Sequence, residues 1–453
     1  MKRTIVTAAA ALMALAALQG RGQALSDDAG APAARRPAVW QPSGEPLAGH
    51  FALTGAPRMR AAVTYRDTIR PGETRYYGIK LDGTSSAYAS AFAVPPPGAR
   101  VTYGDGIEVE LIGADGTLCD RDDAALDDQG APRPVGTAVS RTAGADSPCD
   151  GAGQYHLRVR RTSGSGGSDT TAWPLELRYV VEPPLRPGAT PEPAPYLGSA
   201  SPTPLTTGTV GHAQGGPSPE TAAPVRTGIW QDQVLPGETR FYKVPVDWGQ
   251  QATVFADFGG AQAAGGASSS LVGSGVRLRA YSPVRKFITG AGHSYDGRLV
   301  RIGTQLAPVS YTNRTTSDAQ VSAVRYAGWY YFAVSVHPKV AQVVGGGRPV
   351  ALTLRVDVKG TALPGPPYAG DPAKAGIGVS AHDVTGADGT PPTSSASAAA
   401  PSSSSSGTPG LRLLAFGAFG TGTVLLAGLA GWTVLARRRD RGRRAMDPGP
   451  SHG

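Results

Sequence analysis

The chain has 453 residues with 62 glycines and 40 prolines, which allows two or three domains and leaves much of the chain to linkers. Ten of its 43 basic residues and two of its 34 acidic residues lie in the two end segments, so residues 25–411 hold 33 basic and 32 acidic side chains. Nucleic-acid binding needs a basic stripe that such a balance lacks, and we expect no nucleic-acid partner.

The N-terminal 24 residues predict a secretory signal peptide. Two basic residues, Lys2 and Arg3, precede an apolar run at 5–18, and a small-x-Ala cleavage site ends at Ala24. Because no cysteine follows the apolar run, we expect no lipid anchor at this end. Residues 25–61 follow neither a strand nor a helix period, and we expect them to be loosely ordered.

Residues 62–182, here called module 1, show the alternation of β-strands that have one face on a core and the other in water. Ile107, Val109 and Leu111 alternate with two glutamates, and a similar run begins at Gly153. Pro-Gly and Asp-Gly turns separate such runs, and no capped amphipathic helix interrupts them. We therefore predict an antiparallel β-sandwich.

The only two cysteines, Cys119 and Cys149, both lie in module 1 of a chain that we expect to be exported. We predict one disulfide, which closes a loop of about 30 residues and stabilises a segment that has little apolar content. A redox pair of free thiols is the alternative, but no C-x-x-C spacing supports it.

The acidic stretch DRDDAALDD follows the first cysteine, and we expect it to form a loop. Its carboxylates Asp120, Asp122 and Asp123 are weak candidate calcium ligands, since that ion prefers hard oxygen ligands. Their spacing differs from that of an EF-hand, and a solvated acidic loop without a metal is the interpretation that we favour. We expect no cofactor.

One motif of module 1 returns later in the chain. It reads PGETRYY from Pro71 and PGETRFY from Pro236, and an aromatic-x-Asp triplet precedes each copy. Downstream, GIEVEL and GQYHLRV are matched by GVRLRA and GWYYFAV in the same order. We therefore predict a second copy of the module, module 2, at 226–359, and a linker rich in Pro, Thr and Gly at 183–225.

The C-terminal part of the chain predicts a membrane anchor. Residues 360–411 are rich in Pro and Ser and read as an unfolded stalk. Residues 412–436 contain a run of about 24 uncharged residues, enough to cross a bilayer as one helix. The arginine-rich tail at 437–453 should stay in the cytoplasm by the positive-inside rule, so both modules would lie outside the cell.

Each copy of the repeat resembles the bacterial pre-peptidase C-terminal (PPC) domain. The family opens with a PGE-x-x-x-Y strand, matched from Pro236 to Tyr242, and continues through a Gly-Gln turn, matched at Gly249. A later Gly-x-Tyr-Tyr strand is matched at Gly328 and Tyr331. The resemblance implies two jelly-roll-like antiparallel β-sandwiches without catalytic groups, of the kind that accompany secreted peptidases.

The arrangement of parts also resembles membrane-anchored surface proteins of high-GC Gram-positive, actinobacterial type. Two features depart from the PPC pattern. The chain contains no peptidase domain, and module 1 carries Gln154 beside Tyr155 together with an acidic disulfide-closed segment. These departures put the role of a peptidase appendage in doubt and leave the expected fold unchanged.

The repeated motif predicts a tight turn followed by a charged pair. Proline fixes its own φ, and glycine can adopt positive φ. The Glu and Arg that follow are two positions apart on a strand, so their side chains share a face with the second aromatic residue of the motif. A folding signal is the interpretation that we favour, and an acid/base or partner site is the alternative. The residues are Pro71, Gly72, Glu73, Arg75 and Tyr77, and Pro236, Gly237, Glu238, Arg240 and Tyr242.

Aromatic residues in module 2 provide the candidate ligand contacts. Trp248 and Tyr295 have no aromatic counterpart in module 1, so we consider them as residues that face a ligand such as a sugar. Core packing is the competing interpretation. The stretch GHSYDG around Ser294 resembles a hydrolase nucleophile elbow, but its second glycine falls one position late.

The sequence therefore predicts a non-catalytic cell-surface protein that displays two interaction modules. We expect its partner to be a protein or a cell-wall component, and an accessory role to a separately encoded peptidase or secretion machine is consistent with this expectation. A carbohydrate-binding protein is the competing class, and a hydrolase is the third.

Overall fold

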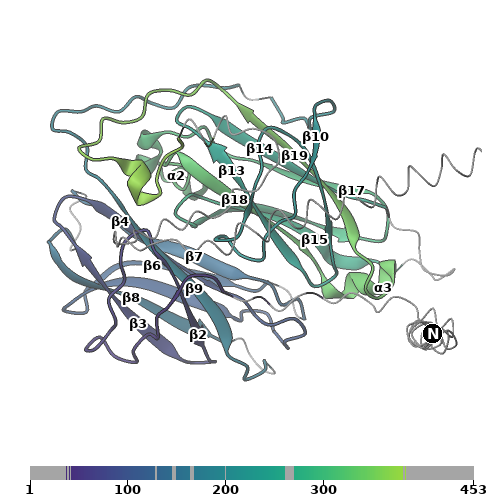
Figure 1. The fold of residues 1–453 in the computed structure, drawn as a ribbon, viewed down its shortest axis with the longest axis horizontal. Helices are drawn as coiled ribbons and strands as arrows, with labels where there is room; N and C mark the ends of the chain where they lie inside the picture. The colour runs from purple at the N-terminus through teal and green to yellow at the C-terminus, as the bar shows by residue number, and fades with distance from the viewer. Residues whose placement is uncertain are drawn as a thin grey trace, which may run out of the picture. The chain divides into compact units, whose positions relative to one another are not determined.

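The computed structural model describes residues 37, 40, 42–127, 130–144, 149–163, 168–198, 200–260, 270–380 and 383. Four β-sheets within these residues form two β-sandwiches, which confirms the all-β prediction (Figure 1). Both sandwiches belong to one compact unit. The predicted signal peptide, membrane span and tail lie outside the described residues. Within the described part of the chain, no helix has the length and apolarity needed to cross a bilayer.

Module 1 is a sandwich of a five-stranded and a four-stranded sheet. Its strands are β1 (Glu45–Pro46), β2 (Thr64–Ile69), β3 (Thr74–Leu81), β4 (Ser86–Ala93), β5 (Gly106–Gly113), β6 (Leu118–Ala125), β7 (Val135–Arg141), β8 (Gly153–Thr162) and β9 (Trp173–Glu182). The sheet orders are β1-β2-β9-β4-β7 and β3-β8-β5-β6. Strand β1 runs parallel to β2, and the other neighbours pair antiparallel.

Module 2 is built from two five-stranded sheets. Its strands are β10 (Val210–His212), β11 (Ala223–Pro224), β12 (Gly228–Val234), β13 (Thr239–Val246), β14 (Gln251–Phe258), β15 (Val272–Tyr281), β16 (Phe287–Tyr295), β17 (Val300–Gln305), β18 (Gly328–Val336) and β19 (Val350–Lys359). The sheet orders are β10-β12-β19-β14-β17 and β11-β13-β18-β15-β16. The short helices are η1 (Tyr311–Thr315), α2 (Ala319–Ser322), η2 (Pro338–Val340), α3 (Ala341–Val344) and η3 (Pro372–Ala375).

The two sandwiches follow one plan, which confirms the internal repeat. The order β2-β9-β4-β7 of module 1 returns as β12-β19-β14-β17 in module 2, and β3-β8-β5-β6 returns as β13-β18-β15-β16. Alternation sets the inward face of each strand. In β19, for example, Val350, Leu352 and Leu354 are buried in the core while Ala351 faces solvent.

The predicted disulfide between Cys119 and Cys149 is present and spans 30 positions. The side chain of Arg141 reinforces the closed segment, because its guanidinium donates to the Cys149 carbonyl (2.9 Å) and to the Gly151 carbonyl (3.0 Å). The expectation of an acidic loop after Cys119 is corrected. Residues 118–125 form the edge strand β6, which pairs along β5.

Segments expected to lie outside the modules contribute to both cores. Met59, in the segment 25–61, is buried in the core of module 1, and Val225, in the predicted linker 183–225, is buried in the core of module 2. Strands β1 and β10 of these segments add parallel edges to the two sandwiches. We predicted that the modules begin at 62 and 226, after these strands, because strands of two or three residues are too short to show a period.

Residues 363–377 form a strap that we expected to belong to the unfolded stalk. Its Tyr368 and Ile377 are buried, and the amide of Ala369 donates to the carbonyl of Pro184 at 2.8 Å. Ile377 packs in one cluster with Tyr88 of module 1 and with residues of module 2. The strap therefore folds back onto module 1 after module 2 is complete.

Strand β4 shows how the two modules meet. Its alanines, such as Ala89 and Ala91, pack in the core of module 1, whereas Tyr88 and Phe92 point the other way and pack against module 2. The ring of Phe92 lies 5.2 Å from that of Tyr281, centroid to centroid. Every residue of β4 is buried as a result, so the face of this strand that would otherwise meet water is an interface.

Candidate functional site

The turns of the repeated motif have the predicted geometry. Gly72 has φ +71° and Gly237 has φ +85°, values that favour glycine. After each turn the glutamate and the arginine pair, with 2.8 Å between Arg75 and Glu73 and 2.8 Å between Arg240 and Glu238. Each glutamate also accepts from a backbone amide that precedes the turn. These contacts close the turn within its own module.

A second repeated cluster lies beside each turn. The hydroxyl of Tyr77 donates to Asp67 at 2.7 Å, and Gly49 N donates to the same carboxylate oxygen at 2.7 Å. In module 2 the hydroxyl of Tyr242 donates to Asp232 at 2.6 Å, and the corresponding glycine amide donates to the same oxygen at 2.9 Å. The aspartate of the aromatic-x-Asp triplet thus joins three chain segments in each module, and the only signal of it in the sequence was that the triplet is repeated.

Close packing explains the glycine of this cluster. A Cβ atom on Gly49 would lie 2.6 Å from the Tyr77 ring, and one on Gly215 would lie 2.7 Å from the Tyr242 ring. Burial, followed by the nearby aspartate, raises the pKa of both tyrosines well above the usual range. Each tyrosine therefore stays a neutral donor, and the geometry is that of a structural cluster rather than an acid/base pair.

The candidate ligand-facing aromatics are both largely enclosed. Tyr295 is 0% exposed in the core of module 2, and its hydroxyl donates to the Gly259 carbonyl at 2.6 Å. A ring enclosed in this way has no free face for a sugar. Trp248 is 9% exposed and also belongs to that core, but it lines a cavity. Ser294 lies on strand β16, outside any strand-turn-helix elbow.

The cavity beside Trp248 has a volume of about 170 Å³ and is open to solvent on one side. Proline-rich stretches at 190–195 and 363–367 form much of its wall, and Tyr311 completes it. The guanidinium of Arg314 lies 3.2 Å from the centre of the Tyr311 ring. One indole and one phenol thus border a small hollow near the start of the strap.

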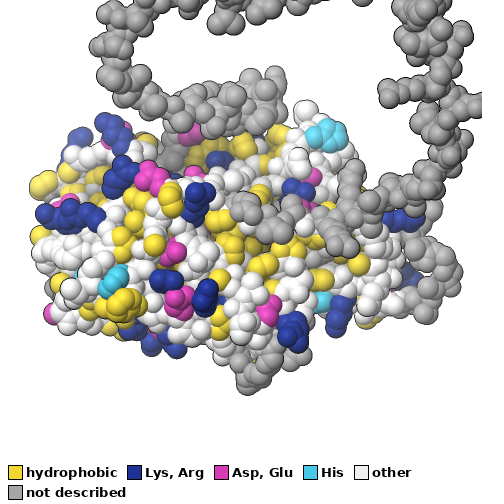
Figure 2. Space-filling view, turned by 60° about the horizontal axis from the view of Figure 1, so that its bottom comes forward, with side chains coloured by type: hydrophobic (Ala, Val, Ile, Leu, Met, Phe, Trp, Pro, Cys, Tyr) yellow, Lys and Arg dark blue, Asp and Glu magenta, His cyan; other side chains and the backbone are white. Residues whose placement is uncertain are grey.

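Two of the three candidate calcium ligands, Asp120 and Asp122, accept hydrogen bonds from other protein groups. Asp120 accepts from Ser140 N at 2.7 Å, and Asp122 accepts from Lys286 Nζ at 2.8 Å. Among the described residues, no three acidic, histidine or cysteine side chains converge on one point. On the face seen in Figure 2, basic and acidic side chains lie interspersed, without a broad patch of one sign.

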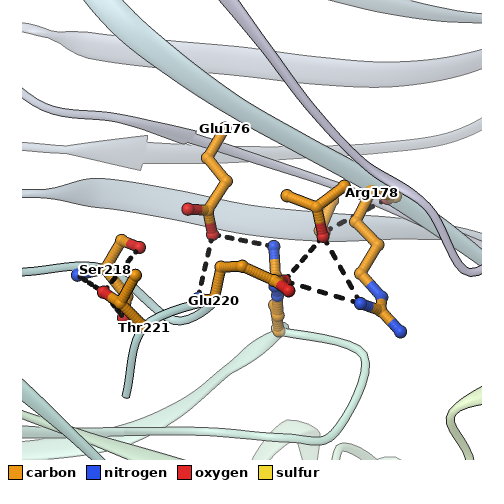
Figure 3. A network of polar contacts seen from close by, with 8 residues as sticks. Glu176, Arg178, Ser218, Glu220 and Thr221 are labelled. Carbon is orange, nitrogen blue, oxygen red and sulfur yellow. Dashed lines mark hydrogen bonds and ion pairs between the residues drawn. The ribbon is translucent and has the colours of Figure 1, made fainter. Parts of the chain in front are cut away.

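A buried polar network joins the modules at one point of their interface (Figure 3). Arg285 of module 2 donates to Glu176 of module 1 at 2.9 Å and to Glu220 at 2.7 Å. Glu220 also accepts from Thr64 at 2.6 Å and lies 3.5 Å from Arg178. The side chains of Arg285 and Glu176 are 1% and 0% exposed, so these charges are fully removed from water.

The electrostatics of the network follow from burial and pairing. Burial raises the pKa of Glu176, although Arg285 opposes the shift. Burial also acts to raise the pKa of Glu220, but Arg285, Thr64 and Arg178 together outweigh it and lower the pKa. The backbone of Arg285 has φ +68°, which is strained for a residue with a side chain. The surrounding contacts therefore hold this arginine in a conformation that the turn alone would avoid.

A second polar cluster at the interface centres on Glu182. Its carboxylate accepts from Tyr88 at 2.6 Å and from Tyr368 of the strap at 2.6 Å, and it pairs with Arg314 at 3.0 Å. Module 1, module 2 and the strap thus converge on one buried carboxylate. Sequence reasoning missed both clusters, because a single Glu or Arg on an alternating strand resembles any solvated position.

No protein-family model matches the chain, and no curated protein matches it. Among solved structures, the tandem CBM22-1-CBM22-2 domain of Xyn10C from Paenibacillus barcinonensis is 11% identical over 65% of this chain and 86% of that one, with a TM-score of 0.17. Tandem CBM51 modules of a family 98 glycoside hydrolase from Streptococcus pneumoniae are 10% identical over 65% and 84%, with a TM-score of 0.16. The ANX1 ectodomain from Arabidopsis thaliana is 11% identical over 65% and 83%, with a TM-score of 0.17. At these TM-scores the likenesses carry no argument.

Proposed function

We propose that the chain is a non-catalytic cell-surface protein whose two modules act as one rigid binding unit for a protein or cell-wall partner. The observation that carries the proposal is the buried pairing of Arg285 with Glu176 across the modules. Removing two such charges from water costs free energy that an apolar contact would not cost. The pair fixes the orientation of the two modules. A binding surface that spans both modules needs such a fixed orientation, whereas a spacer does not.

The proposal places this unit outside the cell. The signal peptide predicted at 1–24 and the span predicted at 412–436, followed by the arginine-rich sequence at 437–453, support a single-pass protein with its modules extracellular. The PPC resemblance supports jelly-roll-like sandwiches that assist a secreted peptidase or a secretion machine. Protease shaving of intact cells tests the topology, since modules that stay protected until lysis would contradict it.

The binding function is tested with the purified exported part, residues 25–411. We expect saturable retention on peptidoglycan or on a membrane-protein extract, and no turnover of peptide or glycan substrates. Hydrolysis that Ser294→Ala abolishes would overturn the non-catalytic proposal. Retention by neutral soluble polysaccharides alone would favour the carbohydrate-binding alternative.

That alternative is favoured by one observation, the cavity of about 170 Å³ that Trp248 and Tyr311 border. Aromatic rings at the edge of a hollow can stack on the apolar face of a sugar. If the cavity binds sugar, Tyr311→Ala should weaken retention on polysaccharide. Tyr103→Ala is the control, because Tyr103 is an exposed tyrosine that does not line the cavity.

A further inference from the structure

Three arginines from both modules surround the carboxylate of Asp127. Arg277 Nη1 lies 2.7 Å and Arg279 Nη2 lies 3.2 Å from the same Asp127 oxygen, and Arg133 pairs with the other oxygen. Asp127 and Arg133 lie between β6 and β7 of module 1 in the sequence, while Arg277 and Arg279 lie on β15 of module 2. The cluster is thus built by both modules.

The cluster holds more positive than negative charge. Among the described residues, three arginines face the single carboxylate of Asp127. The Arg133 side chain is only 4% exposed, and its Nε and Nη1 atoms have no hydrogen-bond partner among the described residues. Burial lowers the pKa of Arg133, and repulsion from Arg279 adds to this effect. An additional anion would relieve that repulsion.

An open cavity of about 230 Å³ lies against two of these arginines, Arg277 and Arg279, and against Asp127. Its floor is the glycine-rich part of β16, where Gly290 and Gly292 offer backbone without side chains. Phe287 borders it with 39% of its surface exposed, and the Arg279 guanidinium lies 5.2 Å from the centre of the phenyl ring. Guanidinium groups bind carboxylate and phosphate oxygens, and an exposed aromatic face packs against a sugar ring.

We propose that this cavity binds an anionic group of an acidic glycan, with Arg279 and Arg277 on the anion and Phe287 against the sugar ring. The inference rests on the proposed cell-wall partner and names its chemical class. Asp127 acts as an internal competitor, since its carboxylate occupies the arginines in the absence of ligand. The anion is a carboxylate or a phosphodiester, which share this chemistry.

The test measures binding of tetragalacturonate, poly(glycerol phosphate) and neutral dextran to residues 25–411 by calorimetry at low salt. We expect at least one acidic probe to bind, dextran to bind no better than background, and affinity to fall as salt rises. Arg279→Gln should weaken binding by about tenfold or more, because it removes a charge-assisted contact. Arg160→Gln, which removes a similarly paired surface arginine of module 1, should leave binding unchanged.

Asp127→Asn separates a binding site from a purely structural salt bridge. Loss of the internal competitor should raise affinity for the acidic probe, even though it also removes ion pairs between the modules. The inference would be overturned if folded Asp127→Asn bound the acidic probe no better than wild type. It would also be overturned if Arg279→Gln left the affinity unchanged.

The retention assay on peptidoglycan and membrane-protein extract, described above, distinguishes this inference from the proposed binding function. Failure of both acidic probes to bind a protein that still retains a partner in the retention assay overturns this inference and leaves the proposed function standing. Failure in both experiments overturns both. Binding of only one acidic probe supports the inference and identifies the anion as a carboxylate or a phosphodiester.

Discussion

Arg285 donates a hydrogen bond to Glu176 across 2.9 Å, although the two residues belong to different modules and lie 109 positions apart. Neither charge has access to water, so each depends on the other for its stability. Glu220 and Thr64 extend the contact on the same side of the interface. The two sandwiches are thereby coupled, because either charge would be buried without a partner if the modules separated without exposing it to water.

Arg285→Met should therefore destabilise the unit by about 3 kcal/mol or more, because it leaves the buried Glu176 carboxylate without its partner. Adding Glu176→Leu should recover part of the loss, since no unpaired charge then remains on that side. The measurement is denaturant unfolding of residues 25–411. Arg160→Met, which breaks an exposed pair with Glu108, is the control and should cost no more than about 1 kcal/mol. Equal losses for the two arginines would contradict the prediction.

Gly237→Val should lower the melting temperature by several degrees. The position has φ +85°, and a left-handed conformation costs a residue with a Cβ about 1–2 kcal/mol, more for a branched one. Glu238→Gln should change stability by no more than about 1 kcal/mol, because an amide oxygen can still accept from Leu235 N. Loss of partner binding by folded Glu238→Gln would instead make this turn the site.

Gly215→Ala should destabilise module 2, because its Cβ would meet the Tyr242 ring at 2.7 Å and displace it from Asp232. Gly49→Ala should act in the same way on module 1. Gly273→Ala is a matched control with open space around the added methyl group, and we expect its effect to stay within about 0.5 kcal/mol. Thermal unfolding by circular dichroism measures all three, and a neutral Gly215→Ala would show that the cluster tolerates a shift of the ring.

Acid should weaken the unit in part through Asp257. This carboxylate is buried, which acts to raise its pKa, but bonds from Arg301 and Arg355 outweigh burial and lower the pKa. The pairing therefore contributes stability above the unfolded pKa of about 3.9 and loses it as pH falls through the folded pKa. The stability difference between wild type and Asp257→Asn should shrink from pH 7 to about pH 2. A difference that stays constant over this range would contradict the assignment.

Local patterns predicted the strands, the repeat, the disulfide and the turn geometry, because each depends on residues close in sequence or on a single pair of cysteines. The interface was missed because its contacts join distant strands. In β4, Tyr88 and Phe92 alternate with alanines, and nothing local tells which face meets a second module. One clue was present in the motif itself. Its two copies differ only where the half-buried Tyr76 becomes Phe241, which is buried at the interface.

The candidate site could be predicted only in part. The repetition of the aromatic-x-Asp triplet was visible in the sequence, but the bonds of Asp67 and Asp232 were not predicted. The cluster around Asp127 depends on how β15 of one module approaches a residue that follows β6 in the other. The alternation that identifies strand β15 predicts that the side chains of Arg277 and Arg279 face water. Only the docked arrangement shows that they share one carboxylate.

The strap at 363–377 determines how a mechanical load would enter the molecule. Before residue 380 the strap bonds Glu182 of module 1 through Tyr368 and packs beside Tyr88 of module 1 through Ile377. Tension applied at residue 380 would therefore reach the hydrogen bond between Gly378 and Ala327 and the packing of Ile377 before it reaches strand β19. Peeling of the strap must precede extension of module 2, so the fold places a releasable latch between any tether and the two sandwiches.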